Sequence, residues 1–207
     1  MADFLIRPET PADHREVEVL TREAFWNVYR PGCMEHYLVH RYRGLEGFVP
    51  QLDLVMEADG RIVGHIMYVH AAIHADGGAV LPVMTFGPIS IAPGYQRRGL
   101  GRALLEDSLA RAAALGAKAV CIEGNPAFYA KAGFVPAAGT GIRYNDEPAD
   151  ATPPYFLLKE LVPGYLGGVS GAYRTPDGYL VAEAEVLRFD ASFPPKQRLR
   201  LPGQLEL

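Results

Sequence analysis

A short segment rich in glycine and arginine, Gln96–Arg102, is the first place where this sequence could carry out chemistry. Its letters are QRRGLGR, and an apolar run that predicts a helix follows directly. The first backbone N–H groups of a helix have no intrahelical partners, and the peptide dipoles place positive charge at that end. Its two glycines allow such N–H groups to approach phosphate oxygens closely, and its arginines add attraction. The segment predicts a binding loop for a phosphate or pyrophosphate, with a solvated charged turn as the alternative.

Two familiar phosphate-binding motifs do not fit this loop. The P-loop requires a Gly-Lys pair followed by Ser or Thr, and the segment has no lysine. A loop of the nucleotide-hydrolysing kind is therefore excluded. The Rossmann fingerprint requires a small residue where Leu104 stands, although Glu123 meets its requirement for an acidic residue about twenty positions further on. The loop thus predicts pyrophosphate binding outside both motifs.

The elements that must position this loop follow from the spacing of apolar residues. Alternating runs between turn residues predict strands, and apolar residues three and four positions apart predict helices. Strands are expected at residues 4–7, 52–57, 61–73, 80–91, 119–122, 134–135 and 155–158. Helices are expected at about residues 11–28, 34–43, 101–115 and 126–132. The strand, helix, strand order from 80 to 122 predicts a right-handed parallel unit, so the expected fold class is α/β (α+β) with a mixed central sheet.

The composition of the chain changes after Lys159. The residues that follow are rich in glycine and aromatic side chains, residues 180–189 predict a further strand, and the last residues predict an extended tail. We therefore expect one domain over residues 1–160 and an extension of unknown role over residues 161–207.

The overall composition disfavours several classes of protein. The 207 residues are 49% hydrophobic and 21% charged, with a formal net charge of −4, which is typical of a soluble globular chain and disfavours nucleic-acid binding. No apolar run approaches the ~18 residues of a membrane span, and no signal-peptide pattern opens the sequence, so we expect a cytoplasmic protein without membrane association. Cys33 and Cys121 lack metal-ligand spacing, so we expect reduced packing residues and no metal.

Two motifs in the right order resemble those of a known family. Gln96–Gly101 fits the pattern Gln/Arg-x-x-Gly-x-Gly/Ala after a strand, and Tyr129–Phe134, YAKAGF, is similar to a Tyr-x-x-x-Gly-Phe element. The sequence resembles the GNAT superfamily of N-acetyltransferases, and in particular a bacterial subgroup of predicted acetyltransferases with a C-terminal extension. The resemblance covers residues 3–160 well. It implies the GNAT fold, with a sheet of six to seven strands that splays between strands four and five, and about four flanking helices.

The resemblance implies acetyl-CoA as the acyl donor. Backbone groups of the strand that ends at Ile91 would pair with the pantetheine arm, the amides of the loop would hold the pyrophosphate, and Asn125 would contact the cofactor. The implied cofactor-binding residues are Ile89, Ser90, Ile91, Arg97, Arg98, Gly99, Leu100, Gly101, Arg102 and Asn125.

Two side chains are implied as catalytic. Tyr129 would protonate the departing CoA thiolate, with packing of a helix on the sheet as the alternative for this ring. Glu123 ends a predicted strand where some relatives keep a general base, with a solvated carboxylate or a water relay as alternatives. The amine would attack the thioester directly, without a covalent enzyme intermediate.

We therefore expect an N-acetyltransferase that acts on a primary amine of a small molecule or peptide. The acceptor itself is not identified, and a homodimer is left open as the assembly. A catalytically silent acyl-CoA-binding regulatory or interaction module is the alternative, and RNA binding through the loop is a weaker one. Four aromatic side chains would line the acceptor pocket or form core, namely Trp26, Tyr29, Tyr37 and Phe48.

Overall fold

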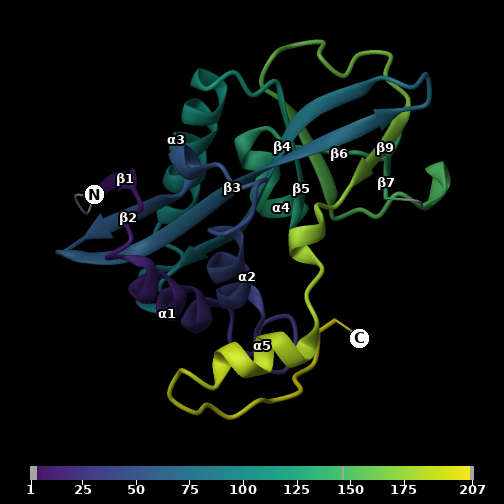
Figure 1. The fold of residues 1–207 in the computed structure, drawn as a ribbon. Coiled ribbons are helices and arrows are strands. Elements are labelled where there is room, and N and C mark those ends of the chain that lie inside the picture. The colour runs from purple at the N-terminus through teal and green to yellow at the C-terminus, as the bar shows by residue number, and fades with distance from the viewer. Residues whose placement is uncertain (1–3, 146, 206–207) are drawn as a thin grey trace. The chain divides into compact units, whose positions relative to one another are not determined.

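The structure is a computed structural model that describes residues 4–145 and 147–205 (Figure 1). Its strands are β1 (Phe4–Pro8), β2 (Leu54–Ala58), β3 (Arg61–Ala75), β4 (Val80–Ile91), β5 (Ala119–Glu123), β6 (Val135–Pro136), β7 (Ile142–Tyr144), β8 (Phe156–Glu160) and β9 (Gly171–Arg174). Its α-helices are α1 (His14–Phe25), α2 (Glu35–Tyr42), α3 (Leu100–Ala114), α4 (Pro126–Tyr129) and α5 (Glu183–Asp190). Short 3-10 helices are η1 (Pro50–Leu52), η2 (Pro93–Tyr95), η3 (Ala130–Ala132), η4 (Ala149–Ala151) and η5 (Asp177–Tyr179).

The predicted α/β class with a mixed sheet is confirmed. The hydrogen-bonded strand order is β1-β2-β3-β4-β5-β8-β6, while β9 pairs with β3 and β7 pairs with β9. The described residues form nine strands where six to seven were predicted, because β7 and β9 add short pairings that have no strong sequence pattern. None of the helices in the described part of the chain is both long and apolar enough to cross a membrane.

The chain divides into two compact units. The first comprises Met1–Met67, Pro88–Leu104 and Gly178–Leu207, and the second comprises Tyr68–Gly87 and Leu105–Asp177. Strands β3 and β4 and helix α3 contribute residues to both. The expected domain boundary at residue 160 stays a prediction.

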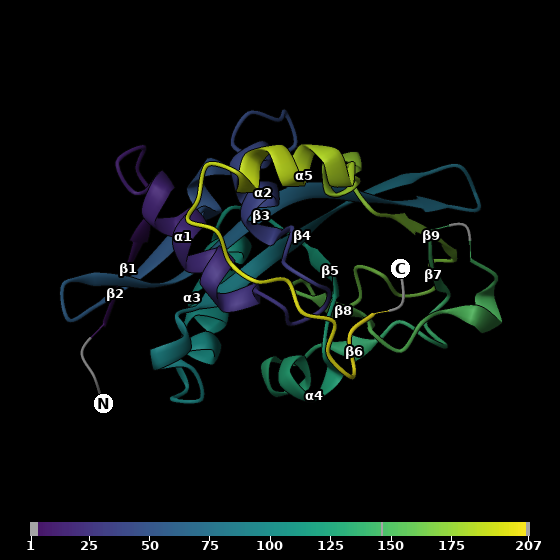
Figure 2. The same cartoon turned by 90° about the horizontal axis from the view of Figure 1, so that it is seen from below.

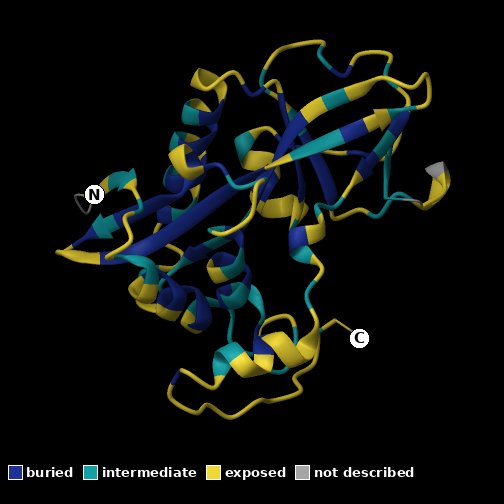
Figure 3. Cartoon of the chain, in the orientation of Figure 1, coloured by how far each residue is buried: buried dark blue, intermediate teal, exposed yellow. Residues whose placement is uncertain are grey.

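In the first unit, β1, β2 and the start of β3 form an antiparallel ladder. Phe4 pairs with Ala58, and the turn Asp59-Gly60 joins β2 to β3. Both turn residues have left-handed φ angles, 52° and 69°, as a tight hairpin turn requires. The ladder is mostly buried, as Figure 3 shows for β2 and β3. Its buried side chains include Leu54, Val55, Met56, Ile62, Val63, Ile66 and Met67.

Helix α5 and the tail after it also belong to the first unit. The carboxylate of Asp190, at the end of α5, pairs with Arg22 Nε of α1 at 2.6 Å. The tail then passes the end of α1, where the indole N–H of Trp26 and the amide of Asn27 both donate to the carbonyl of Gln197, at 2.9 and 3.1 Å. Figures 1 and 2 show α5 beside α2.

The strand predicted at residues 180–189 is wrong, because this segment contains α5. Alternation of alanine and glutamate suggested a period of two, but both residues favour helices over strands. Val186 and Phe189 are three positions apart and lie on one face of α5, and Phe193 follows the end of the helix. That face packs on α2, since the Phe189 ring lies 4.4 Å from the ring of His40, centroid to centroid.

The second unit is built around β5. This strand pairs antiparallel with β8 over five residues, whereas its parallel ladder with β4 is confined, among the described residues, to Met84 and Val120. Such a short ladder agrees with the prediction that the sheet splays between strands four and five. β9 pairs antiparallel with the end of β3 and parallel with β7. The core of this unit includes Ile73, Val83, Ala119, Cys121, Ile142, Phe156, Leu158 and Tyr173.

Candidate functional site

The predicted phosphate loop of the first unit has the backbone shape of an anion-binding turn. Arg97 and Gly99 have left-handed φ angles of 60° and 85°. The carbonyl of Gly99 accepts the N–H of Ala103 at 3.0 Å, so α3 begins at Leu100 and its first N–H groups have no intrahelical acceptor. The loop is exposed, and nothing lies within 4 Å of the position that a Cβ on Gly99 would take. This concave, open backbone can accommodate a phosphate group.

Side chains outside the glycine pattern hold the loop in place. Gln96 Nε2 donates to the carbonyl of Ile91 at 2.9 Å and so joins the loop to the end of β4. The hydroxyl of Tyr95 donates to Asp59 at 3.0 Å, and the guanidinium of Arg98 lies 5.3 Å from the ring centre of Tyr95. These contacts fix a turn that the two glycines alone would leave free to move.

The three predicted cofactor-binding residues at the end of β4 differ in burial. Ser90 is buried, and its hydroxyl donates to Thr21 Oγ1 of α1 at 3.1 Å. Ile89 and Ile91 are half-buried, and Ile91 lies so close to Gly64 that a Cβ there would come within 2.8 Å of it. The serine side chain therefore packs β4 on α1, and the pairing of this backbone with a pantetheine arm stays a prediction.

In the second unit, Glu123 ends β5 and Asn125 opens α4. The side-chain oxygen of Asn125 accepts the N–H of Ala127 at 2.9 Å, and Pro126 takes the first helical position. Asn125 is thus a helix N-cap by its geometry. Its predicted contact with the cofactor stays a prediction.

The ring of Tyr129 packs among aromatic side chains of the second unit. It is 8% exposed, and its centroid lies 5.9 Å from Phe86, 4.9 Å from Phe128 and 5.7 Å from Phe134. The ring also lies against Gly124, where any side chain would collide with it. Position 124 must therefore be glycine for Tyr129 to lie beside the end of β5, a requirement that the sequence analysis missed.

The carboxylate of Glu123 has hydroxyl neighbours that the sequence analysis also missed. Thr175 Oγ1 donates to Glu123 Oε1 at 3.3 Å, and the hydroxyl of Tyr144 lies 3.5 Å from the same Oγ1 atom. Burial raises the pKa of Tyr144, and the negative charge of Glu123 raises it further. Tyr144 therefore stays protonated as a donor. Thr175 lies in the segment that the sequence analysis left without a role.

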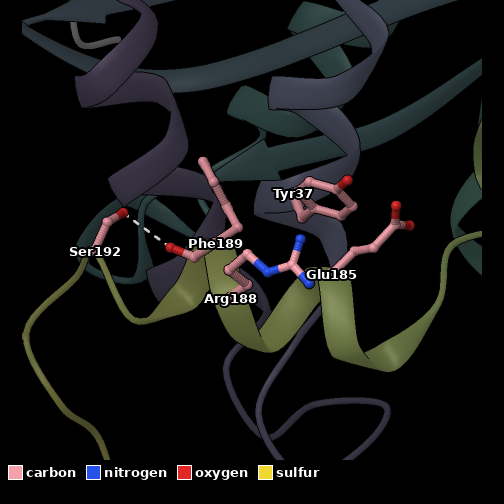
Figure 4. Close-up of a pocket in the computed structure, with 5 residues that line it drawn as sticks. All are labelled: Tyr37, Glu185, Arg188, Phe189 and Ser192. Atoms are coloured by element: carbon pink, nitrogen blue, oxygen red, sulfur yellow. Dashed lines mark hydrogen bonds between the residues drawn. The ribbon is translucent and has the colours of Figure 1, made fainter.

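Two shallow hollows lie on the described surface, one in each unit. In the first unit, a hollow of about 340 Å³ lies between α2 and α5, and Figure 4 shows Tyr37 facing Arg188 across it. In the second unit, a hollow of about 370 Å³ lies over the end of β3 and β9. Its lining includes His70, His74, Arg174 and Thr175. Thr175 thus connects this hollow to the Glu123 carboxylate.

A buried polar cluster in the first unit has the residue types of a metal site. The ligand atoms of Glu9, Asp53 and His65 lie within 4.8 Å of one another. The guanidinium of Arg43, however, already pairs with Glu9 at 2.6 Å. Burial raises the pKa of Glu9 to about 7 and lowers that of His65 to about 4. A cluster with its own cation fits a structural role better than metal binding.

Both cysteines lie in the interior, and the thiol of Cys33 lies 3.3 Å from His36 Nδ1. Cys33 and Cys121 are buried, and burial raises the pKa of each thiol well above its usual value. Their thiols therefore stay protonated, which agrees with the prediction that both are packing residues rather than nucleophiles.

Comparison with known proteins adds to this geometry. The model of the acetyltransferase (GNAT) domain matches residues 52–136, which include the phosphate loop, Glu123 and Tyr129. The chain is 28% identical to the uncharacterized N-acetyltransferase YhbS of Escherichia coli K12 over 168 residues, which are 81% of this chain and 93% of that protein. It is 29% identical to the uncharacterized N-acetyltransferase YjhQ of the same strain over 90 residues, so the match spans about half of that relative, 49% of its length.

Two solved structures share the fold. The crystal structure of the GNAT family N-acetyltransferase YhbS from Escherichia coli in complex with CoA has a TM-score of 0.74 at 27% identity, covering 87% of this chain and 94% of that one. A GNAT family acetyltransferase from Brucella melitensis in complex with acetyl-CoA has a TM-score of 0.67 at 24% identity, covering 86% of this chain and 99% of that one, and this second likeness concerns the fold alone.

Proposed function

Because residues 52–136 carry a GNAT acetyltransferase domain, we propose that this protein transfers the acetyl group of acetyl-CoA to a primary amine of a small molecule or peptide. The observation that carries the proposal is the left-handed turn at Arg97 and Gly99 that leads directly into the N-terminus of α3. The CoA found in the YhbS structure supports it, as does the tyrosine that follows β5.

We propose that the loop binds the pyrophosphate of acetyl-CoA. The amides from Arg97 to Arg102 would donate to phosphate oxygens, and the guanidinium groups would add long-range attraction. Acetyl-CoA supplies the activated acyl group. A strand-four amide near Ile89 would polarise the thioester carbonyl, and direct attack requires the amine to be held in line with that carbonyl carbon.

The transfer moves two protons. The amine nitrogen forms a bond to the thioester carbonyl carbon, and the C–S bond breaks as the tetrahedral arrangement collapses. Glu123 accepts the proton that the amine nitrogen loses, directly or through a water molecule. Tyr129 donates a proton to the departing thiolate sulfur. Each side chain returns to its starting state by exchange with solvent.

Tyr129→Phe tests this assignment. We expect the turnover number for thiol release over an amine panel to fall by about 10²-fold, because the phenylalanine ring keeps the packing but cannot donate a proton. Calorimetry should show unchanged acetyl-CoA affinity. Tyr165→Phe is the matched control, since this hydroxyl donates to the carbonyl of Pro82 in the same unit and has no proposed role in transfer. Unchanged turnover in Tyr129→Phe would remove Tyr129 from this role and leave it as a packing residue.

The same measurements separate the alternative function. A catalytically silent acyl-CoA-binding module would bind acetyl-CoA tightly in the calorimeter and release no thiol with any amine. The wild-type protein showing this pattern would replace the proposed enzyme by the binding module.

A further inference from the structure

Thr175 and Asn145 lock each other in place beside Glu123. The backbone N–H of Thr175 donates to Asn145 Oδ1 at 2.8 Å, and Asn145 Nδ2 donates to Thr175 Oγ1 at 3.2 Å. The N–H of Asn145 donates to the carbonyl of Tyr173 at 2.7 Å. Both polar atoms of the asparagine side chain are therefore used to hold one threonine.

The backbone of Asn145 is strained to make this lock. Its φ angle is 51°, in the left-handed region that asparagine tolerates better than most side chains. Such conformations cost free energy and persist where the surrounding structure requires them. The left-handed conformation of Asn145 therefore indicates that the surrounding structure holds Thr175 in this position.

The hydrogen bonds between Asn145 and Thr175 determine which acceptor the hydroxyl of Thr175 can donate to. Asn145 already donates to Thr175 Oγ1, so the hydroxyl is free to donate elsewhere. Its two acceptors are Glu123 Oε1 at 3.3 Å and the hydroxyl of Tyr144 at 3.5 Å. A carboxylate is the stronger acceptor and lies nearer, so the proton points to Glu123.

A neutral donor orients this carboxylate. Within residues 4–145 and 147–205, the hydroxyl of Thr175 hydrogen-bonds to Glu123, and the hydroxyl of Tyr144 lies beside it at 3.5 Å from Thr175 Oγ1. A hydroxyl group fixes the direction of the carboxylate without the opposing charge of a lysine or arginine.

We propose that Thr175 is a positioning residue, which aims the carboxylate of Glu123 at the acceptor amine, and that the hollow beyond Thr175 is where this amine approaches. The inference rests on the proposed function, because it needs Glu123 to act as the base. It assigns a role to the segment after residue 160, which supplies Thr175 through β9. Asn145 supports the same carboxylate one step further away.

Thr175→Val tests the proposal with Thr175→Ser as its matched control. Valine keeps the shape of threonine and the backbone bond to Asn145, but it cannot donate to Glu123, whereas serine can. We expect the turnover number of Thr175→Val to fall about tenfold, the size that loss of one hydrogen bond to a charged group gives, and that of Thr175→Ser to stay within about twofold. The KM for acetyl-CoA should not change, and the acidic limb of the pH–rate profile should move to higher pH in the valine variant.

A double-mutant cycle distinguishes positioning from a general structural effect. In a Glu123→Gln background, Thr175→Val should cause no further loss, because Thr175 acts through the carboxylate. An equal fall in both backgrounds, or an unchanged pH–rate profile, would overturn the positioning role while the activity of the wild type still supports the proposed function. A wild-type protein without transfer to any amine would overturn the proposed function and, with it, this inference.

Discussion

Two glutamates of this protein show opposite ways of holding a carboxylate. Glu123, in the second unit, is exposed and accepts a hydrogen bond from the hydroxyl of Thr175. The Glu9 side chain, in the first unit, is 1% exposed and accepts two bonds from Arg43, at 2.6 and 3.1 Å. The first carboxylate is oriented by a neutral group at the surface, and the second is neutralised in the interior.

The difference shows that a perturbed pKa does not by itself mark the reacting group. Burial, followed by the hydrogen bond to Asp53, raises the pKa of Glu9 to about 7, and burial lowers that of His65 to about 4. A search for perturbed groups would choose this cluster first. Burial is the largest cause of both shifts, and the ion pair with Arg43 opposes the rise for Glu9, whereas Glu123, the proposed base, is exposed.

Glu123→Gln should give the largest effect of these substitutions. It tests whether Glu123, unlike Glu9, acts in catalysis. We expect kcat/KM for acyl transfer to fall by about 10³-fold, because the amide cannot accept the amine proton. The melting temperature should change little, since the side chain is exposed. Thiol release and thermal unfolding of the same sample measure both. A large fall in melting temperature with modest loss of activity would instead assign Glu123 a structural role like that of Glu9.

Arg43→Met should give the next largest effect, and on stability. Its guanidinium pairs with Glu9 and with Glu18 at 3.0 Å, so its removal leaves buried carboxylates without a cation. We expect the free energy of unfolding to fall by about 4 kcal/mol in chemical denaturation.

The control for Arg43→Met is Arg111→Met, which breaks an exposed pair with Asp107 on α3 and should cost less than about 1 kcal/mol. Equal losses in the two variants would show that the cluster around Glu9 does not contribute to stability as a buried network.

Glu9→Gln should give the smallest effect, visible as a pH dependence. The pKa of Glu9 is about 7 in the folded chain against a usual value of 4.5, so its contribution to stability is present below pH 4.5 and is lost as pH rises through 7. A glutamine side chain does not titrate in this range, so the variant does not lose stability at position 9 as the pH rises. The free energy of unfolding of the variant, relative to wild type, should therefore increase by ~3 kcal/mol between pH 4.5 and 7.5.

Denaturant titrations at several pH values measure this difference. Glu46→Gln, which removes a carboxyl group at an exposed loop position, is the control for this substitution. A constant difference for Glu9→Gln would mean that Glu9 is ionised in the folded chain throughout this range.

Much of the fold follows from local patterns. The strand at residues 80–91 was predicted with the bounds of β4, and the helix expected at residues 101–115 is α3, Leu100–Ala114. The phosphate loop was equally readable, because its glycines and arginines are consecutive in the sequence. Such features depend on residues that are neighbours in the chain.

The side chains that surround Glu123 could not be predicted from local sequence patterns. Thr175 and Tyr144 lie 52 and 21 positions away from it, and the pairing of β7 with β9 that brings them together has no local signal. Gly124 is required by the ring of Tyr129, a contact made through the fold rather than by sequence spacing. The strand expected at residues 180–189 is wrong for a different reason, because the helix propensity of its alanine and glutamate residues was overlooked.

The attachment of the tail to α1 has a spectroscopic consequence. Trp26 is the single tryptophan of the sequence, and its indole N–H donates to the carbonyl of Gln197 in the tail. The guanidinium of Arg22 and the ammonium of Lys196 lie over its ring, at 4.2 and 5.4 Å from the centroid. Tryptophan fluorescence therefore comes from this one position. Detachment of the tail would remove both the hydrogen bond to the indole and the Lys196 charge beside its ring. The tryptophan emission follows the C-terminal segment without any label.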